Sequence, residues 1–290
     1  MSWVNAIIHG MLLGGLYALF ACGLSLMFGV MRVINLAHGD LAVVAAYVAI
    51  GVIAVTHIPT VWSFVLVVPI FAALGYVLQR TLLQASLERG PLTTLLVTFG
   101  LSVVIENALL QFLSADSHSL DIGALVTDSF TIGSQISVAY VLLAFFVVAV
   151  AVLLGLQYFL SRSRHGRLIR AVADDREAAQ LSGADYRHIF GIAAAIAFGT
   201  VALAGLAFGM WSQFDPTVGT DQLLLFAFEA VVIGGLGSLW GTLAGGVTLG
   251  VAQQIGAQFG SADQILAGQL VFLAILVILP QGITGWRRTA

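Results

Sequence analysis

The 290-residue sequence contains no lysine, and all eleven Lys and Arg positions are arginine. A phosphate-binding loop of the form G-x-x-x-x-G-K-[ST] needs its lysine to reach the nucleotide phosphates, so the chain cannot contain one. The same absence excludes Schiff-base chemistry on a lysine side chain. If ATP drives this protein, another chain must hydrolyse it.

Cysteine and charge are also scarce. The single cysteine, Cys22, excludes an internal disulfide and lies in an apolar run where we expect a small buried residue. Only 9% of residues are charged, against about a quarter in soluble domains, while 60% are hydrophobic and the mean hydropathy is +1.03. This composition predicts a polytopic membrane protein. The net charge of -3 is small, and nothing indicates nucleic-acid binding.

The sequence also lacks the motifs of hydrolytic enzymes. It contains neither H-E-x-x-H nor G-x-S-x-G, and no second His or Cys stands at ligand spacing from His38. Ser238, within a glycine-rich stretch, would suit an intramembrane serine protease, but helix packing explains those glycines better. We therefore expect a protein that is not an enzyme, with no catalytic residue, no metal site and no cofactor of its own.

Apolar windows of about 20 residues predict an all-α transmembrane bundle of eight or nine spans, folded as one domain over residues 1–290. Residues 6–30 are long enough to span and follow no basic segment, so we expect no cleaved signal peptide. The number of spans stays at eight or nine because Met31–Asp40 and Gly234–Gly246 could each be a discontinuous or re-entrant helix. The expected spans are residues 6–30, 41–56, 61–79, 92–113, 138–160, 189–211, 223–232 continued by 247–259, and 265–283.

Charge is distributed unevenly between the loops. Residues 161–188 hold six of the eleven arginines, and residues 80–89 and the C-terminus are also basic. Residues 114–137 instead carry Asp116, Asp121 and Asp128 with no arginine. Because basic loops are retained in the cytoplasm, this pattern predicts that residues 80–89, 161–188 and the C-terminus are cytoplasmic and that residues 114–137 are external.

The basic loop contains a short predicted helix between Asp174 and Gly183. Asp174 and Glu177 have the spacing of a capping box, and Gly183 is placed to adopt the left-handed conformation that ends a helix. Ala178 and Ala179, with Leu181, give the helix an apolar side. It is either a solvated connector or a docking helix for a cytosolic partner that approaches the small alanines.

Several polar residues lie within or beside the predicted spans. Asn35, His38 and Asp40 form the most polar patch before residue 79, and on a helix Asn35 and His38 would share a face. They either line a translocation route through a broken helix or simply meet water in a turn.

Two carboxylates are expected within the bilayer. Glu106 and Glu229 lie in apolar segments, where a charge is costly and faces the bundle interior or an aqueous cavity. Either residue belongs to the translocation pathway or to a structural ion pair, and Glu106 is also near enough to a span end to reach water.

Gly237, Gly241 and Gly245 recur every four residues in the glycine-rich segment. On one helix they would form a stripe of bare backbone, which favours either close helix packing or a broken helix beside a cavity.

These motifs together resemble one family. Glu177-Ala178-Ala179, followed after three residues by Gly183, resembles the E-A-A-x-x-x-G loop of bacterial ABC importer permeases, although the usual later Ile-x-Leu-Pro element is absent. Residues 14–19, 23–30 and 33–40, with the glycine-containing runs 202–209 and 234–246, look like the branched-chain amino acid permeases, first of two paired membrane subunits. The resemblance covers essentially the whole chain.

The resemblance implies a bacterial inner-membrane subunit whose loop 161–188 couples to an ATPase through Asp174, Glu177, Ala178, Ala179 and Gly183. The implied partners are a second homologous permease subunit, two cytosolic chains that bind ATP and Mg, and a periplasmic binding protein. Related permeases carry urea, short amides or other small solutes, so the substrate stays open. From the residues alone, an ion-coupled secondary transporter using Glu106 or Glu229 and a passive channel are also compatible.

Overall fold

The computed structural model describes residues 3–123, 129–132 and 136–285. Within them, the long helices are α1 (Trp3–Met31), α2 (His38–Thr56), α3 (Ser63–Leu78), α5 (Pro91–Leu113), α6 (Tyr140–Arg162), α9 (Tyr186–Trp211), α11 (Leu239–Gly256) and α12 (Ser261–Ile278). The shorter helices are η1 (Thr60–Trp62), α4 (Gln84–Leu87), α7 (Arg164–Asp174), α8 (Arg176–Leu181), α10 (Leu224–Gly234) and α13 (Gly282–Gly285). Two π-helical turns continue neighbouring helices, η2 (Gln79–Leu83) after α3 and η4 (Gly219–Leu223) before α10.

The predicted transmembrane bundle is confirmed. In the described part of the chain, seven helical segments are long and apolar enough to cross a membrane, and an eighth span is possible. That eighth is the pair formed by residues 219–234 and 239–256, which bend by 116° relative to each other. The sequence predicts eight or nine spans, and the maximum of eight in the structure agrees with the smaller of these counts.

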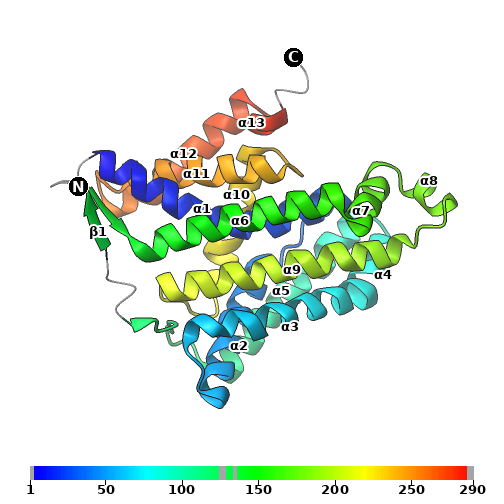
Figure 1. Ribbon diagram of the computed structural model, residues 1–290, viewed down its shortest axis with the longest axis horizontal. Helices are drawn as coiled ribbons and strands as arrows, with labels where there is room; N and C mark the ends of the chain where they lie inside the picture. The colour runs from blue at the N-terminus through cyan, green and yellow to red at the C-terminus, as the bar shows by residue number, and fades with distance from the viewer. Residues whose placement is uncertain (1–2, 124–128, 133–135, 286–290) are drawn as a thin grey trace.

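The bundle has two distinct ends. A short antiparallel hairpin, β1 (Ser129–Ile132) and β2 (Ile136–Ala139), lies at one end, and α7 and α8 lie at the other (Figure 1). We call these the hairpin end and the α7–α8 end. The hairpin and an isolated antiparallel bridge between His118 and Phe214 are the β-structure among the described residues. Asp128 of the predicted acidic loop lies outside them.

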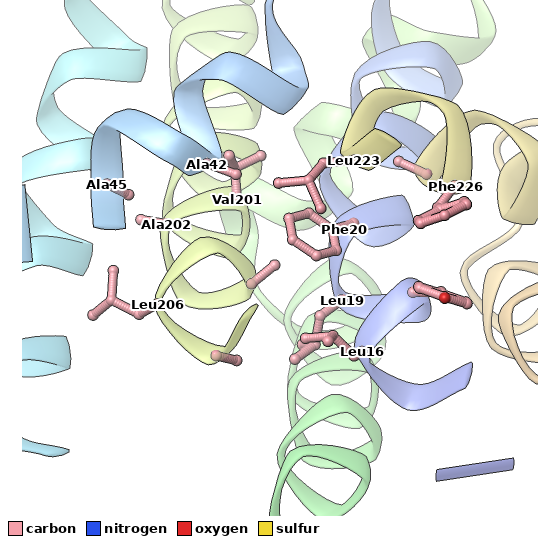
Figure 2. Packing of buried hydrophobic residues seen from close by; sticks show 14 of the residues in the cluster. Leu16, Leu19, Phe20, Ala42, Ala45, Val201, Ala202, Leu206, Leu223 and Phe226 are labelled. Atoms are coloured by element: carbon pink, nitrogen blue, oxygen red, sulfur yellow. The ribbon is translucent and has the colours of Figure 1, made fainter. Parts of the chain in front are cut away.

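The central helix is α1, most of whose residues are buried. Its most extensive contact is with α11, and it also packs on α6, α9 and α10. Glycine makes this closeness possible, because a Cβ on Gly14 or on Gly246 would overlap the backbone of the opposite helix. Figure 2 shows Leu16, Leu19 and Phe20 of α1 in this core, together with side chains of α2, α9 and α10.

The first predicted discontinuity is present. After α1 the chain leaves the helix at Arg32, which has φ of 58°, and α2 begins only at His38. The Nε2 atom of His38 lies 2.9 Å from the carbonyl oxygen of Phe20, so the chain folds back against the middle of α1 before α2 starts. Asn35 and His38 do not share a helical face, because Asn35 lies in this break and its Oδ1 accepts the backbone N–H of Ala37 at 3.1 Å.

The glycine-rich segment is the second discontinuity. Gly235 and Gly237 adopt φ of 103° and 81° between α10 and α11, so Gly237 belongs to the turn and not to a helical stripe. Gly241 and Gly245 do lie on α11 and face Gly234 and Ala230 of α10. The glycines thus serve both predicted purposes: they break the helix, and they allow its two arms to pack backbone against backbone.

The perimeter of the bundle is apolar. Leu92, Leu96 and Phe99 of α5 and Val277 and Ile278 of α12 are more than half exposed. A belt of exposed large hydrophobic side chains is costly in water and is typical of a surface that faces lipid. The chain is therefore a multi-pass membrane protein.

Candidate functional site

The short helix in the basic loop is present as α8, with one correction to its predicted start. Its N-cap is Asp175, whose Oδ1 accepts the N–H groups of Glu177 and Ala178 at 2.9 and 3.0 Å. Asp174, the predicted cap, is instead the last residue of α7. Of the two adjacent Asp residues, the second caps α8, because α7 extends through the first.

The predicted end of α8 is confirmed. Gly183 has φ of 87°, and its N–H donates to Gln180 while that of Ala184 donates to Ala179, both at 3.0 Å. This is the pair of hydrogen bonds of a Schellman motif, which satisfies carbonyl groups that the helix leaves free. A cap at each end lets a six-residue helix persist outside the bundle.

One side of α8 is attached and the other is free. Ala179 is buried in a cluster that includes Tyr186 and Ile189 of α9. Glu177 and Ala178 are exposed, and the Leu181 side chain is 91% exposed. The helix therefore presents an acidic residue, a small residue and a leucine to whatever lies beyond the α7–α8 end.

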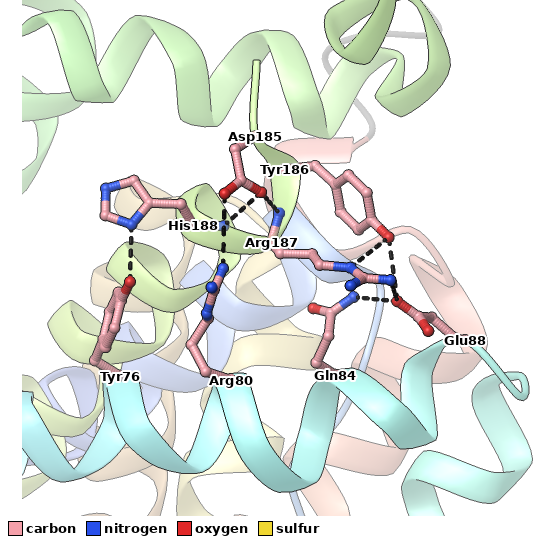
Figure 3. A network of polar contacts seen from close by, with 8 residues as sticks. All are labelled: Tyr76, Arg80, Gln84, Glu88, Asp185, Tyr186, Arg187 and His188. Carbon is pink, nitrogen blue, oxygen red and sulfur yellow. Dashed lines mark hydrogen bonds and ion pairs between the residues drawn. The ribbon is translucent and has the colours of Figure 1, made fainter. Parts of the chain in front are cut away.

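A polar network joins α3, η2 and α4 to the start of α9 (Figure 3), and α8 contacts it through Arg176. The guanidinium of Arg176 in α8 lies 3.8 Å from the ring centre of Tyr186, whose hydroxyl donates to Glu88 at 3.2 Å. Arg187 forms an ion pair with Glu88 at 2.8 Å, and Gln84 donates to the same carboxylate at 3.0 Å. The amide of Gln84, followed by the partners on α9, lowers the pKa of Glu88 below its ordinary value.

Two more pairs extend this network along α3 and η2. Arg80 lies 3.7 Å from Asp185, which also caps α9, and the Tyr76 hydroxyl lies 2.8 Å from Nδ1 of His188. These contacts fasten the start of α9 to the adjoining end of α3. A displacement of α8 would therefore be transmitted to two long helices.

A second polar group lies at the beginning of α2. Buried Asp40 accepts hydrogen bonds from Ser102 of α5 and from Thr220 of η4, the latter at 2.8 Å. The Thr220 hydroxyl also lies 3.4 Å from Glu106. The structure thus brings together Asp40 and Glu106, two of the predicted pathway residues, at the meeting point of α2, α5 and η4.

The other predicted pathway residues lie apart from this pair. His38 and Asn35 are fully buried at the break before α2, and Nδ1 of His38 and Nδ2 of Asn35 make no hydrogen bond within the described residues. Glu229 of α10 is also fully buried, and neither carboxylate oxygen has a partner of hydrogen-bonding geometry there. Gln269 of α12 is the polar side chain that faces it.

Sequence reasoning missed several of these participants. Ser102, Thr220 and Tyr186 carry no motif, and their importance comes only from contacts between distant segments. Gln253, buried in α11 and bonded to the Tyr17 hydroxyl at 2.5 Å, offered a signal, since an uncharged polar residue in an apolar span still requires a partner. No group of three or more metal-ligating side chains occurs in the described part of the chain.

Comparisons with known proteins agree with this architecture. Residues 6–280 match the family described as "Branched-chain amino acid transport system / permease component". The chain is 29% identical over 297 residues to BraD of Pseudomonas aeruginosa, a high-affinity branched-chain amino acid transport system permease protein, covering 98% of this chain and 96% of BraD. The LivH proteins of Salmonella typhimurium and Escherichia coli K12, which bear the same description, are 28% and 27% identical over 300 residues at the same coverage.

No solved structure matches this chain. The family match nevertheless spans nearly every described helix, including the two discontinuities, α8 and the carboxylates at Asp40, Glu106 and Glu229. The chain belongs to the branched-chain amino acid transport system permease family.

Proposed function

We propose that this chain is a membrane-spanning subunit of a bacterial ABC importer that moves branched-chain amino acids into the cell. The family match carries the proposal, and the curated relatives are described as branched-chain amino acid permeases. The sequence contains no lysine for a phosphate-binding loop, so the energy of ATP has to come from other chains.

The proposed assembly contains a second, homologous permease subunit, two cytosolic subunits that bind ATP and Mg, and a periplasmic binding protein. The arginine-rich α7–α8 end and the C-terminus would face the cytoplasm, and the hairpin end would face the periplasm of an inner membrane. α8 would dock into an ATP-binding subunit through Glu177, Ala178 and Leu181, which are exposed.

The polar network gives the docked helix a mechanical role. Movement of α8 would pull on Tyr186 through Arg176 and Ala179, and Tyr186 is joined to Glu88 at the end of α4. Docking that favours one position of α8 would therefore bias the bundle between inward-open and outward-open states.

A charge reversal on the exposed side of α8 tests this function. Glu177→Lys places a cation in the first helical turn and in the docking surface, so ATP-driven leucine uptake should be lost while membrane insertion is normal. Ser117→Lys, an equal charge at an exposed position of the hairpin end, should leave uptake unchanged. Wild-type uptake by Glu177→Lys at normal expression would contradict the role of α8.

An ion-coupled transporter is the second candidate, because Asp40 and Glu106 meet across Thr220 as a coupling site would. Purification from the native membrane in mild detergent separates the two. A second polytopic chain, two ATP-binding chains and ATPase activity stimulated by a periplasmic protein with leucine support the importer. A lone chain without ATPase activity supports the ion-coupled transporter.

A further inference from the structure

A polar cavity of about 370 Å³ opens in the half of the bundle nearer the hairpin, between α1, α6, α9, α11 and α12. Its position follows from its lining: His9 lies 2.7 Å from the carbonyl oxygen of Ser137 beside the hairpin, and Trp211 and Ser261 stand at the ends of their helices. This volume is within the ~300–1,000 Å³ typical of small-molecule sites. We call it the glutamine cavity.

The chemistry of the cavity is amphipathic and uncharged. Four glutamines contribute to its wall, Gln222, Gln253, Gln254 and Gln264, and each amide can both donate and accept hydrogen bonds. Leucine, isoleucine, phenylalanine and tryptophan side chains form the apolar part of the wall, and His9, Tyr17 and two serines complete it. No Asp, Glu or Arg stands among the described residues that line the cavity. A ligand with net charge would lose its hydration without gaining a counter-charge, so the lining favours a net-neutral ligand.

The inner wall is formed by a buried hydrogen bond. The Tyr17 hydroxyl donates to Gln253 at 2.5 Å, and the Tyr17 ring packs on Phe226 with centroids 4.9 Å apart. Gly268 of α12 leaves room for Gln253, since a Cβ there would lie 2.9 Å from the Gln253 Cγ. The pair is therefore held by packing from α10 and α12.

Glu229 lies beyond this pair. Gln222, Phe226 and Glu229 follow one another at helical spacing on η4 and α10, and the Phe226 ring packs on Tyr17. Glu229 is a fully buried carboxylate that faces Gln269 of α12, and in membrane proteins buried carboxylates mark substrate or ion routes. The polar side chains thus continue from the cavity wall toward the bundle interior.

We propose that the glutamine cavity binds a zwitterionic α-amino acid with an apolar side chain. The amides hydrogen-bond both the carboxylate and the ammonium group, the leucine and phenylalanine side chains receive the aliphatic part, and the absence of charge in the lining selects against acidic and basic amino acids. The inference rests on the proposed permease function and places a substrate station within this one subunit.

Cysteine protection in native membranes that contain the assembled transporter tests the site. Gln264→Cys places a thiol in the wall, and the native Cys22 is fully buried, so a soluble maleimide reports on the new thiol. L-leucine at about ten times its Kd should slow labelling about tenfold by occupancy alone. Isoamylamine and isovalerate, which each carry half of the zwitterion, should not protect. Ser117→Cys, at an exposed position outside the cavity, is the matched control, and Ser261→Cys is a second position in the lining.

The outcomes separate this inference from the function on which it rests. No protection at either cavity position, in membranes whose wild-type transporter accumulates leucine, would overturn the cavity site and leave the permease function intact. Equal protection by either half-molecule would overturn the zwitterion assignment. Protection by leucine without leucine uptake would support the site and contradict the proposed function.

Discussion

Individual glycines decide how closely the helices of this bundle approach. Gly14 and Gly246 meet between α1 and α11, and Gly234, Gly241 and Gly245 meet between α10 and α11. Lipid-exposed helices gain no hydrophobic drive from association, so close backbone contact supplies much of their attraction. The loss of stability caused by a Gly→Ala substitution should therefore depend on what surrounds that glycine, and not on the number of glycines in the helix.

Gly245→Ala and Gly155→Ala test this dependence. The new Cβ at Gly245 would overlap the carbonyl oxygen of Ala230, whereas nothing lies within 4 Å of a Cβ at Gly155. We expect Gly245→Ala to abolish or sharply reduce the yield of monodisperse protein in detergent. Gly155→Ala, in the middle of α6, should be neutral or stabilising by up to about 1 kcal/mol, because alanine is the better helix former. Equal thermal stability of the two variants would contradict the packing role of Gly245.

The environment of Glu88 predicts that the stability of the folded protein at the α7–α8 end depends on pH. Hydrogen bonds from Gln84 and Tyr186 and the charge of Arg187 lower the pKa of Glu88 below its ordinary value of 4.5. A lowered carboxylate pKa adds stability at pH above the ordinary value, and this contribution is lost as the pH falls through the lowered pKa of the folded state.

Thermal unfolding of the wild type and of Glu88→Gln should therefore differ at pH 7 and converge in acid, below pH 4.5. Because the Glu88 side chain is 37% exposed, the difference at pH 7 should also shrink in high salt. A difference that does not change between pH 7 and acid would show that the carboxylate charge contributes nothing to the contact between α4 and α9.

At the scale of elements, α8 shows where sequence reasoning succeeds. Its existence, its small residues and its left-handed end at Gly183 follow from local signals and are confirmed. Its start differs by one residue, because the sequence offers two adjacent Asp residues and no local rule says where α7 ends. The packing of Ala179 against α9 depends on distant residues and is not readable from the loop itself.

The two Asp residues give a matched pair of variants. Asp175→Ala removes the acceptor for the N–H groups of Glu177 and Ala178, which should cost about 1 kcal/mol of local helix stability. Asp174→Ala should leave these hydrogen bonds unchanged. Amide hydrogen exchange over residues 176–181 should accelerate only in Asp175→Ala, with no change in the core of α1. Faster exchange in Asp174→Ala alone would contradict the assignment of Asp175 as the cap and support the capping box at Asp174 that the sequence predicts.

The discontinuous helices mark the limit of local prediction. Both were expected, since polar residues or glycines interrupt apolar segments at residues 31–40 and 234–246. What could not be predicted is their consequence: α2 begins beside the middle of α1, where Asp40 reaches Ser102 and Thr220. Those partners are 62 and 180 residues away in sequence, and only the three-dimensional packing of the helices brings them together.

At the scale of the whole molecule, composition and charge asymmetry were enough to predict a polytopic bundle with chemically different ends. The structure confirms the bundle and places α4, α7 and α8 at the end opposite the hairpin (Figure 1). Assigning these ends to the two sides of a membrane rests on the distribution of arginine. That assignment underlies both the docking of α8 and the entry of substrate from the hairpin end.

Labelling of single introduced cysteines in intact cells tests this orientation directly. Ser117→Cys, exposed at the hairpin end, should react with a membrane-impermeant maleimide in intact cells, and Leu181→Cys on α8 should react only after permeabilisation. Native Cys22 is fully buried and provides a low background. The reverse pattern would place α8 outside the cell, where no ATP-hydrolysing partner could reach it, and the proposed coupling would have to be abandoned. Labelling of both positions in intact cells would contradict the assignment of the two ends to opposite sides.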